Sequence, residues 1–223
     1  NLSQNVVHSD SDLILHNSSV LIDKEPLFKG GSFFMGKNRV WVEGTIVAAL
    51  AMVLSLIPIQ IGSSFSISLG QIPLTLFALR RGTKAGMLAG FIWGILHFPL
   101  GQVYYLSVVQ VLIEYPIAYT FAGAAGLMAS NVQKGYVDDN TKQIRKSIVF
   151  GALIGALSRY FWHFIAGVVF WGAYALWGMN PWLFSFVMNG ASGLSTAIVT
   201  IIVLLGIQQT TPSIFVPDKR QEL

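Results

Sequence analysis

Five ionisable side chains stand inside long apolar runs of this sequence, where a charge is costly unless it has a partner or a function. They are Glu43, His97, Glu114, Arg159 and His163. A charged side chain at the centre of a bilayer costs about 2.5–3.5 kcal/mol on insertion scales, so each is a candidate functional residue. The chain has no cysteine, which excludes disulfides and thiolate chemistry. Because the two histidines fall on different predicted helices, we expect no metal site and no bound cofactor.

Glu114 is the strongest candidate for contact with a ligand. Its span runs inward from about Tyr104, which places the carboxylate about 15 Å below the outer membrane surface. The same count places further side chains about 3–15 Å deep on three other spans: Trp93, His163, Trp171 and Asn189. A carboxylate, hydrogen-bonding groups and aromatic faces suit a cationic, ring-containing ligand. The alternative is an aromatic core around a satisfied glutamate.

One face of the fifth apolar run carries His163, Gly167 and Trp171 at positions i, i+4 and i+8. Residues at this spacing line one side of a helix. Gly167 leaves a notch between the other two side chains in which a ring could lie. The alternative is that this glycine serves helix–helix contact.

The other three ionisable residues point to structural roles. Glu43 is near the inner end of its span and can reach water. Arg159 is expected to neutralise a carboxylate or to cap backbone carbonyls. His97, near the outer end of its span, is expected to face water or cap the helix rather than contact a ligand.

The composition indicates that a bilayer surrounds the helices that must position these residues. Hydrophobic residues make up 53% of the chain and charged residues only 11%, against about 25% in soluble domains. The mean hydropathy is +0.61. Six spans are predicted near 40–58, 71–80, 84–99, 104–129, 147–173 and 182–207. The second is short, which predicts a half-helix or a tilted piece packed within protein.

The distribution of lysine and arginine predicts the topology of this all-α, six-helix membrane bundle. Basic residues precede the first span, follow the second, fourth and sixth, and are absent from the connections 59–70, 100–103 and 174–181. By the positive-inside rule both termini are cytoplasmic. Trp177 and Trp182 then lie at the outer interface, as aromatic belts do.

Three segments are predicted along the chain. Residues 1–38 form a polar, unpatterned extension, flexible or added by cloning. Residues 39–208 form the six-helix membrane domain, and 209–223 a cytoplasmic tail.

The sequence gives little support to three other classes of protein: intramembrane proteases, ATPases and nucleic-acid-binding proteins. Gly190-Ala191-Ser192-Gly193 spells the GxSG of intramembrane serine proteases, but no histidine follows Ser192 to act as base. A run of small residues for helix packing explains it better. The chain has no GxxxxGK[ST] loop for ATP, and its basic residues form no face that could follow nucleic acid phosphates.

With these residues in view, the chain resembles the thiamine-specific substrate-binding (S) components of bacterial energy-coupling factor transporters, from about Arg39 to about Gly206. The resemblance is carried by several motifs together: Leu54 to Pro58, Leu79 to Gly82, Phe91 to Ile95, Gln110 to Tyr115, Tyr160 to Trp171, and Asn189-Gly190. It implies a six-helix bundle in the bacterial cell membrane that binds the vitamin near its outer face. It also implies two kinds of partner, a transmembrane coupling protein (T component) and two cytoplasmic ATPase subunits.

The resemblance implies a ligand pocket residue by residue. Glu114 corresponds to the carboxylate that holds the aminopyrimidine ring. Other pocket positions are matched by Trp93, Tyr104, Tyr115, His163, Gly167, Trp171 and Asn189. Three positions depart: Ser64 replaces a tryptophan for which Phe65 could substitute as a lid, Ser68 replaces a glutamate, and Phe184 replaces a tyrosine. These departures bear on affinity and loop closure.

The family's first helix docks on the coupling protein through small residues at four-residue spacing. Here Thr45 and Ala49 match, with Gly44 and Ala48 beside them. Small residues let membrane helices approach closely. The expected function is therefore capture of thiamine for ATP-driven import, without covalent chemistry. The alternatives are an S component for a pyrimidine or pyridoxine-like vitamin, and an intramembrane enzyme.

Overall fold

The computed structural model describes residues 29–61 and 65–217, with side chains from Arg39 onward. In chain order its elements are α2 (Lys29–Ser55), β1 (Gln60–Ile61), β2 (Phe65–Ser66), α3 (Gln71–Arg81), α4 (Thr83–Leu96), α5 (Val108–Leu112), η1 (Ile113–Ile117), α6 (Ala118–Ala122), η2 (Gly123–Met128), α7 (Ala129–Val137), α8 (Thr141–Phe170), η3 (Gly172–Tyr174), α9 (Pro181–Thr210) and η4 (Pro212–Phe215). The elements from α5 to α7 follow one another without a break, so they form one continuous helical segment, the α5–α7 segment.

The predicted all-α, six-helix membrane bundle is confirmed. Within the described residues, three helical segments are long and apolar enough to cross a membrane: Val108–Val137, Thr141–Phe170 and Pro181–Thr210. The helix α4 is a shorter apolar helix, and α3 has only 11 residues, as the short second span predicted. The two strands β1 and β2 pair antiparallel in the connection between α2 and α3, where the sequence predicted a loop.

The helices extend beyond the predicted spans at several ends. The helix α2 begins at Lys29, inside the segment that the sequence assigned to an extension. The α5–α7 segment continues to Val137, and α8 begins at Thr141, where the Asn140 side chain accepts a hydrogen bond from the Gln143 N–H. Hydropathy marks only the apolar part of a helix, whereas hydrogen bonding and capping carry it on into polar sequence.

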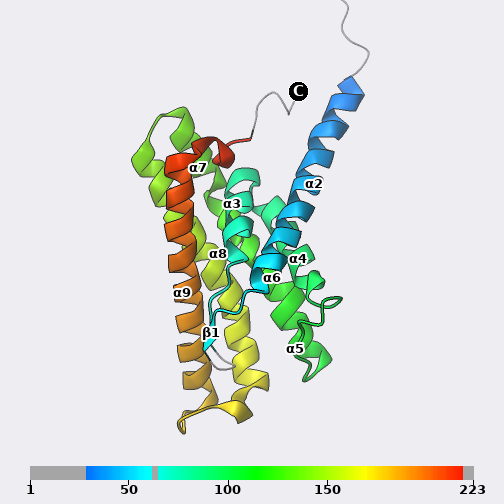
Figure 1. Cartoon of the computed structure of the whole chain (residues 1–223), viewed down its shortest axis with the longest axis vertical. Coiled ribbons are helices and arrows are strands. Elements are labelled where there is room, and N and C mark those ends of the chain that lie inside the picture. The colour runs from blue at the N-terminus through cyan, green and yellow to red at the C-terminus, as the bar shows by residue number, and fades with distance from the viewer. Residues whose placement is uncertain (1–28, 62–64, 218–223) are drawn as a thin grey trace, which may run out of the picture.

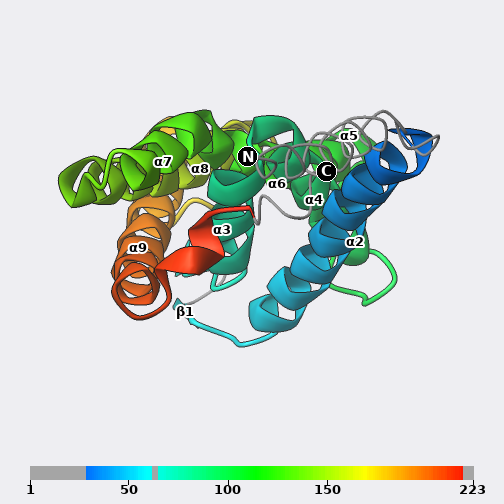
Figure 2. The same ribbon diagram turned by 90° about the horizontal axis from the view of Figure 1, so that it is seen from above.

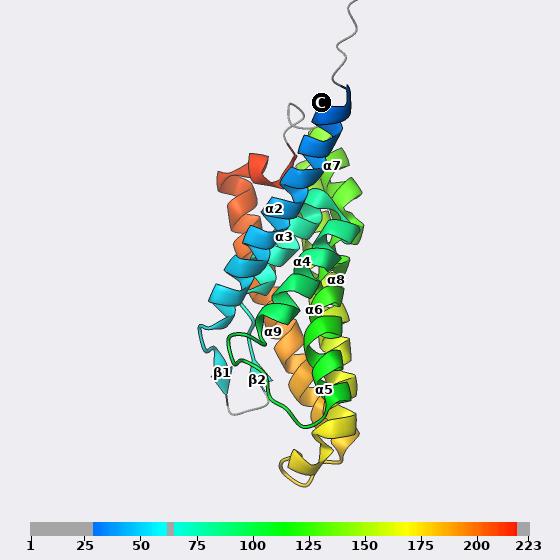
Figure 3. The ribbon, with the colours of Figure 1, turned by 90° about the vertical axis from the view of Figure 1, so that its right-hand side faces the viewer.

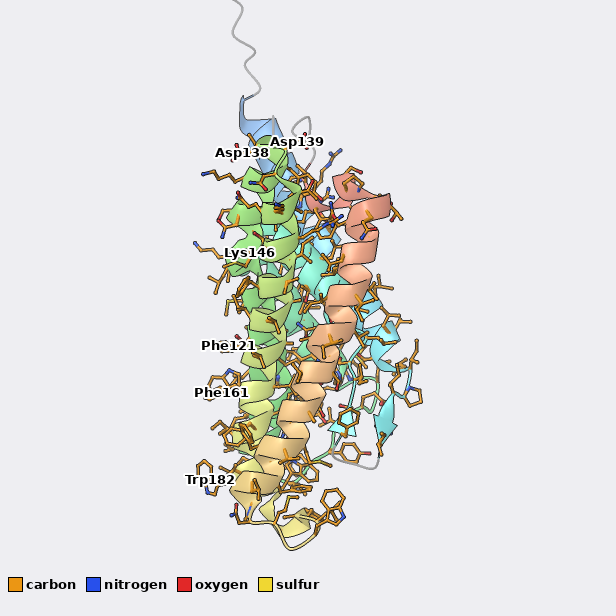
Figure 4. The ribbon with its side chains drawn as sticks, turned by 90° about the vertical axis from the view of Figure 1, so that its left-hand side faces the viewer. Phe121, Asp138, Asp139, Lys146, Phe161 and Trp182 are labelled. Carbon is orange, nitrogen blue, oxygen red and sulfur yellow. The ribbon has the colours of Figure 1, made fainter. Side chains whose placement is uncertain are left out.

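Two long helices, α2 and α9, lie on opposite sides of the bundle (Figure 1). Seen from above, α3 lies between them (Figure 2). The helix α2 begins, and α9 ends, at the end of the bundle that we call the charged end. There Asp138, Asp139 and Lys146 lie, while Trp182 lies near the opposite end (Figure 4). That opposite end is called the cavity end below.

Small residues bring α4 directly onto the α5–α7 segment. A Cβ atom at Gly90 would meet the Tyr119 carbonyl oxygen, and a Cβ at Gly123 would meet the backbone of Gly86 and Met87. These backbones approach so closely that only glycine fits, as is common where membrane helices pack. The α5–α7 segment, which carries Glu114, is therefore held firmly against α4.

An ion cluster closes the charged end. The Glu43 carboxylate pairs with Arg80 Nε at 3.1 Å and with Arg81 Nη2 at 2.7 Å. Arg80 Nη1 also donates to the Ile214 carbonyl at 2.8 Å, and the neighbouring Phe215 is fully buried. The structural role predicted for Glu43 is confirmed, and the start of the predicted tail packs on the bundle.

Candidate functional site

A cavity of roughly 540 Å³ opens at the cavity end, between the ends of α2, α4, the α5–α7 segment, α8 and α9. Its volume is in the range of small-molecule sites. Seven of the predicted ligand-binding residues line it: Tyr104, Glu114, Tyr115, His163, Gly167, Trp171 and Asn189. The eighth, Trp93, is not among the described lining residues.

The carboxylate of Glu114 is buried in the cavity wall and held by neutral partners. Trp171 Nε1 donates to Glu114 Oε1 at 2.6 Å, and the Gln110 amide donates to Oε2. Within the described residues no cation pairs with this carboxylate at 4 Å or less. Its negative charge is thus hydrogen-bonded but has no counter-charge in direct contact.

The backbone at Glu114 is a turn of π-helix, η1, which contains Pro116. Single π-turns within α-helices are frequent at functional sites. Proline has no N–H to donate, and the ring disfavours the normal α-helical bonding pattern around it. In this wide turn Glu114, Tyr115 and Pro116 are all buried, so two consecutive polar side chains reach the interior.

Gln110 is a site residue that the sequence analysis did not assign a role. Its buried amide donates to Glu114 and to the Tyr104 carbonyl at 3.0 Å, and its oxygen accepts from the Leu106 N–H at 3.0 Å. It therefore ties the cavity carboxylate to the loop between α4 and α5. The signal was its spacing, since Gln110 precedes Glu114 by four residues, on the same helical face.

Tyr104, predicted to begin the fourth span, lies instead in that loop, at the mouth of the cavity. The loop spans 97–107 and so is longer than the predicted 100–103 connection. The Tyr104 N–H donates to Tyr115 Oη at 2.9 Å, and its ring meets that of Trp171 edge to face, with centroids 6.3 Å apart. Tyr104 is 75% exposed, so its ring can cover a ligand without being part of the core.

The predicted face of α8 lines the cavity, and it is one turn longer than the sequence analysis recognised. Arg159 precedes His163 by four residues and also lines the cavity, so four residues follow at this spacing from Arg159 to Trp171. The notch at Gly167 is filled by α9, because a Cβ there would meet Ser185 Oγ and, at 3.0 Å, Asn189 Nδ2. Of the two interpretations of Gly167, helix–helix contact describes its surroundings.

On α9, polar side chains complete the wall. Ser185 Oγ donates to the Phe164 carbonyl at 2.8 Å and accepts from Asn189 Nδ2 at 3.1 Å. The buried Phe184 also lines the cavity.

The β1–β2 hairpin and the residues after it form another wall, near the end of α2 (Figure 3). The Ser66 N–H donates to Ser192 Oγ and the Ser68 N–H to Thr196 Oγ1, each at 3.1 Å. Ser192 therefore anchors the hairpin. Ser64, at which the sequence departs from the family, lies outside the described residues.

Trp93 and His97 belong to an aromatic cluster in which His97 lines the cavity and Trp93 lies behind the wall. Trp93 is fully buried, donates to Ser55 Oγ at 3.2 Å and meets Tyr119 edge to face. His97 Nδ1 lies 3.0 Å from the Trp93 carbonyl oxygen, so it caps α4 as expected. Of the two roles expected for His97, capping is the one observed, and the residue is buried and lines the cavity rather than facing bulk water.

The expectation for Arg159 is wrong. Among the described residues no carboxylate lies within ion-pair distance of it, and no backbone carbonyl accepts its hydrogen bonds. Its guanidinium carbon instead lies 4.1–5.2 Å from the ring centroids of Trp93, Tyr119 and Tyr160. Cation–π attraction to three rings provides the stabilisation that a carboxylate was expected to give.

The four small residues predicted to dock a partner divide into two pairs. Gly44 and Ala48 are buried, and a Cβ at Gly44 would lie 3.2 Å from the Phe77 ring. Thr45 and Ala49 are exposed on the outer face of α2. Only this second pair is placed to meet another protein.

Together the fold and site define a helical membrane protein with an internal cavity for a small ligand, built from one carboxylate, two imidazoles and several aromatic rings. The family model described as thiamine transporter protein (Thia_YuaJ) matches residues 41–216, and the chain belongs to that family.

Individual proteins similar to this chain are also thiamine transporters by name. The thiamine transporter ThiT of Lacticaseibacillus paracasei is 40% identical over 181 residues, which cover 79% of this chain and 90% of the relative. ThiT of Bacillus subtilis is 31% identical, covering 80% of this chain and 94% of the relative. The solved structure of ThiT from Listeria monocytogenes superposes with a TM-score of 0.79 at 45% identity, covering 81% of this chain and 99% of that one. These relatives are named as transporters, which is not an enzyme function.

Proposed function

We propose that this chain is the thiamine-binding S component of an energy-coupling factor importer in the bacterial cell membrane. The observation that carries the proposal is Glu114, a buried carboxylate in a ring-lined cavity with only neutral partners in contact. Thiamine has a fixed positive charge on its thiazolium ring and an aminopyrimidine that donates hydrogen bonds. A buried carboxylate gains most from such a ligand, because few water molecules compete for it.

The aromatic residues support the same ligand class. Trp171 donates to the carboxylate, and Tyr104 connects the Trp171 ring to Tyr115. The faces of such rings attract cations. Their edges and faces also pack on flat heterocycles. Tyr104 and Trp171 are proposed to enclose one ring of the vitamin, and His163 and Asn189 to supply hydrogen bonds. Trp93 is proposed to contribute to the binding site from behind the cavity wall, without itself lining the cavity.

The proposed direction of transport rests on the charges at the two ends of the bundle, and the proposed partners rest on the exposed face of α2. The charged end, with Arg80, Arg81 and Lys84, is proposed to face the cytoplasm, so that the multi-pass chain opens its cavity outward. Thr45 and Ala49 on the exposed face of α2 are proposed to contact a transmembrane coupling protein. Two ATPase subunits bound to that protein would drive release inward.

Tryptophan fluorescence of the detergent-solubilised full chain tests the ligand. Thiamine should quench it saturably, and Trp171→Phe should remove most of the signal. Trp182→Phe is the matched control, because Trp182 is 63% exposed and lies outside the described lining. Mass spectrometry of ligand that co-purifies with the chain gives an independent readout. Saturable quenching by pyridoxine and none by thiamine would replace the proposal by the same fold with another vitamin.

A further inference from the structure

Arg159 carries hydrogen-bond donors that the protein leaves unused. The residue is only 4% exposed and lines the cavity. Its buried Nε and Nη1 atoms have no acceptor among the described residues. Buried charged donors are normally paired, because an unpaired one has lost water and gained nothing in return.

Aromatic rings surround the guanidinium of Arg159, but its Nε and Nη1 donors have no acceptor among the described residues. The rings of Trp93, Tyr119 and Tyr160 pack around the guanidinium and offer π faces. Tyr160 Oη is already engaged at 3.1 Å with Thr196 Oγ1. The cage therefore stabilises the charge while Nε and Nη1 keep no acceptor within the described residues, which is the state of a binding group rather than of a structural ion pair.

A second unpartnered nitrogen lies one turn away. His163 Nε2 is buried without a hydrogen-bond partner in the described structure, and His163 lines the same cavity. Arg159 and His163 are four residues apart on α8, on one helical face. Trp171, which holds Glu114, is 12 residues beyond Arg159 along α8, or about 18 Å of helix.

We propose that Arg159 forms a second polar subsite, which donates hydrogen bonds to an uncharged or anionic acceptor of the ligand, with His163 beside it. This inference rests on the proposed function. The cavity then has a negative wall at Glu114 and a positive wall at Arg159. The fixed cation of the ligand is repelled from Arg159, so the part that reaches Arg159 is neutral or negative. Thiamine offers two such acceptors, a nitrogen of the pyrimidine ring and the oxygen of the hydroxyethyl group.

Binding of four ligands to the wild-type chain tests the subsite by calorimetry. They are thiamine, an analogue without the hydroxyl oxygen, and an analogue in which a C–H replaces a pyrimidine ring nitrogen (one for each ring position). We expect one analogue to bind at least about tenfold more weakly than thiamine, because hydrogen bonds to charged groups are among the stronger ones. The analogue that loses affinity identifies the acceptor.

The same ligands are then measured on Arg159→Met, Arg159→Lys and Arg145→Met. In Arg159→Met the affinity difference between thiamine and that analogue should disappear, and Arg159→Lys should restore part of it. Arg145→Met, on the same helix but outside the described lining, should keep the whole difference.

Two results overturn the subsite. One is a wild-type chain that binds thiamine and all analogues equally, which needs no variant to fold. The other is a discrimination that survives unchanged in Arg159→Met. A wild-type chain that binds none of these compounds would instead overturn the proposed function.

Discussion

Two carboxylates on the helices of the bundle, Glu43 at the charged end and Glu114 at the cavity end, have opposite surroundings. Glu43 meets two guanidinium groups at 2.7–3.1 Å. Glu114 meets an indole N–H and an amide. Conversely, the buried guanidinium of Arg159 has three rings around it and no carboxylate in the described structure within ion-pair distance.

The difference separates a structural charge from a binding charge. At the charged end the protein provides both the negative and the positive charge, and their attraction holds α2 against α3. At the cavity end the two signs are kept apart on different walls. An ion pair that is not formed inside the protein leaves each partner able to interact with a ligand.

The largest expected effect concerns transport. Arginine at Ala49 should reduce ATP-dependent thiamine uptake in vesicles to background while thiamine affinity in detergent stays normal. Ala49 is exposed on α2, and a long cationic side chain there would prevent close helix contact. Ile202→Arg, on the exposed face of α9, is the matched control for the cost of a charge in lipid. Normal uptake by Ala49→Arg would show that this face of α2 is not the docking surface.

The next largest effect contrasts the two carboxylates directly. Glu114→Gln should weaken thiamine binding by about 2–5 kcal/mol, or roughly 30- to 5,000-fold, since it removes the charge that faces the ligand. Glu43→Gln should leave affinity unchanged and lower the thermal unfolding temperature instead. Calorimetry and thermal unfolding of both variants check this. Equal affinities for wild type and Glu114→Gln would remove the distinction between the two ends.

Gln110→Leu should have a smaller effect on binding, about tenfold. The substitution removes one of the two hydrogen bonds to Glu114 and leaves the Tyr104 carbonyl and the Leu106 N–H without their Gln110 partner, so the carboxylate and the mouth loop are held less firmly. Gln143→Leu is the control, because Gln143 is bound to the Asn131 carbonyl outside the described lining. If both variants bind thiamine as the wild type does, Gln110 does not position the site.

The smallest expected effect is a few-fold loss of affinity in Gly167→Ala. The added methyl would push Ser185 and Asn189 of α9 away from α8, and Asn189 lines the cavity. Gly190→Ala on α9 meets open space and should bind normally. Titration of both variants by fluorescence compares them. An unchanged affinity in Gly167→Ala would mean that the separation of α8 and α9 does not matter for the ligand.

The sequence predicted most of the cavity because spacing on a helix is local information. His163, Gly167 and Trp171 share a face whatever surrounds them. The binding role of Arg159 was missed because it depends on an absence, the lack of a nearby acceptor, which only the packed helices reveal. Gln110 was missed because its partners include backbone atoms of a loop.

The two pairs of small residues on α2 show a second kind of information that the sequence does not contain, the direction in which a membrane helix faces. In lipid an outward face is as apolar as an inward one, so the sequence of α2 does not indicate its orientation. Gly44 and Ala48 were therefore grouped with Thr45 and Ala49, although the two pairs face in different directions.

The π-turn at Ile113–Ile117 makes the length of this segment as important as its composition. It accommodates one residue more than an α-helical turn would. If all the residues of the segment were instead wound as regular α-helix, everything before the turn would be rotated by about 100° relative to everything after it. Gln110 and the loop that it ties would then turn away from Tyr119, although every residue type of the site was still present. A protein designer who transfers this site to another helical scaffold must therefore reproduce the wide turn as well as its residues.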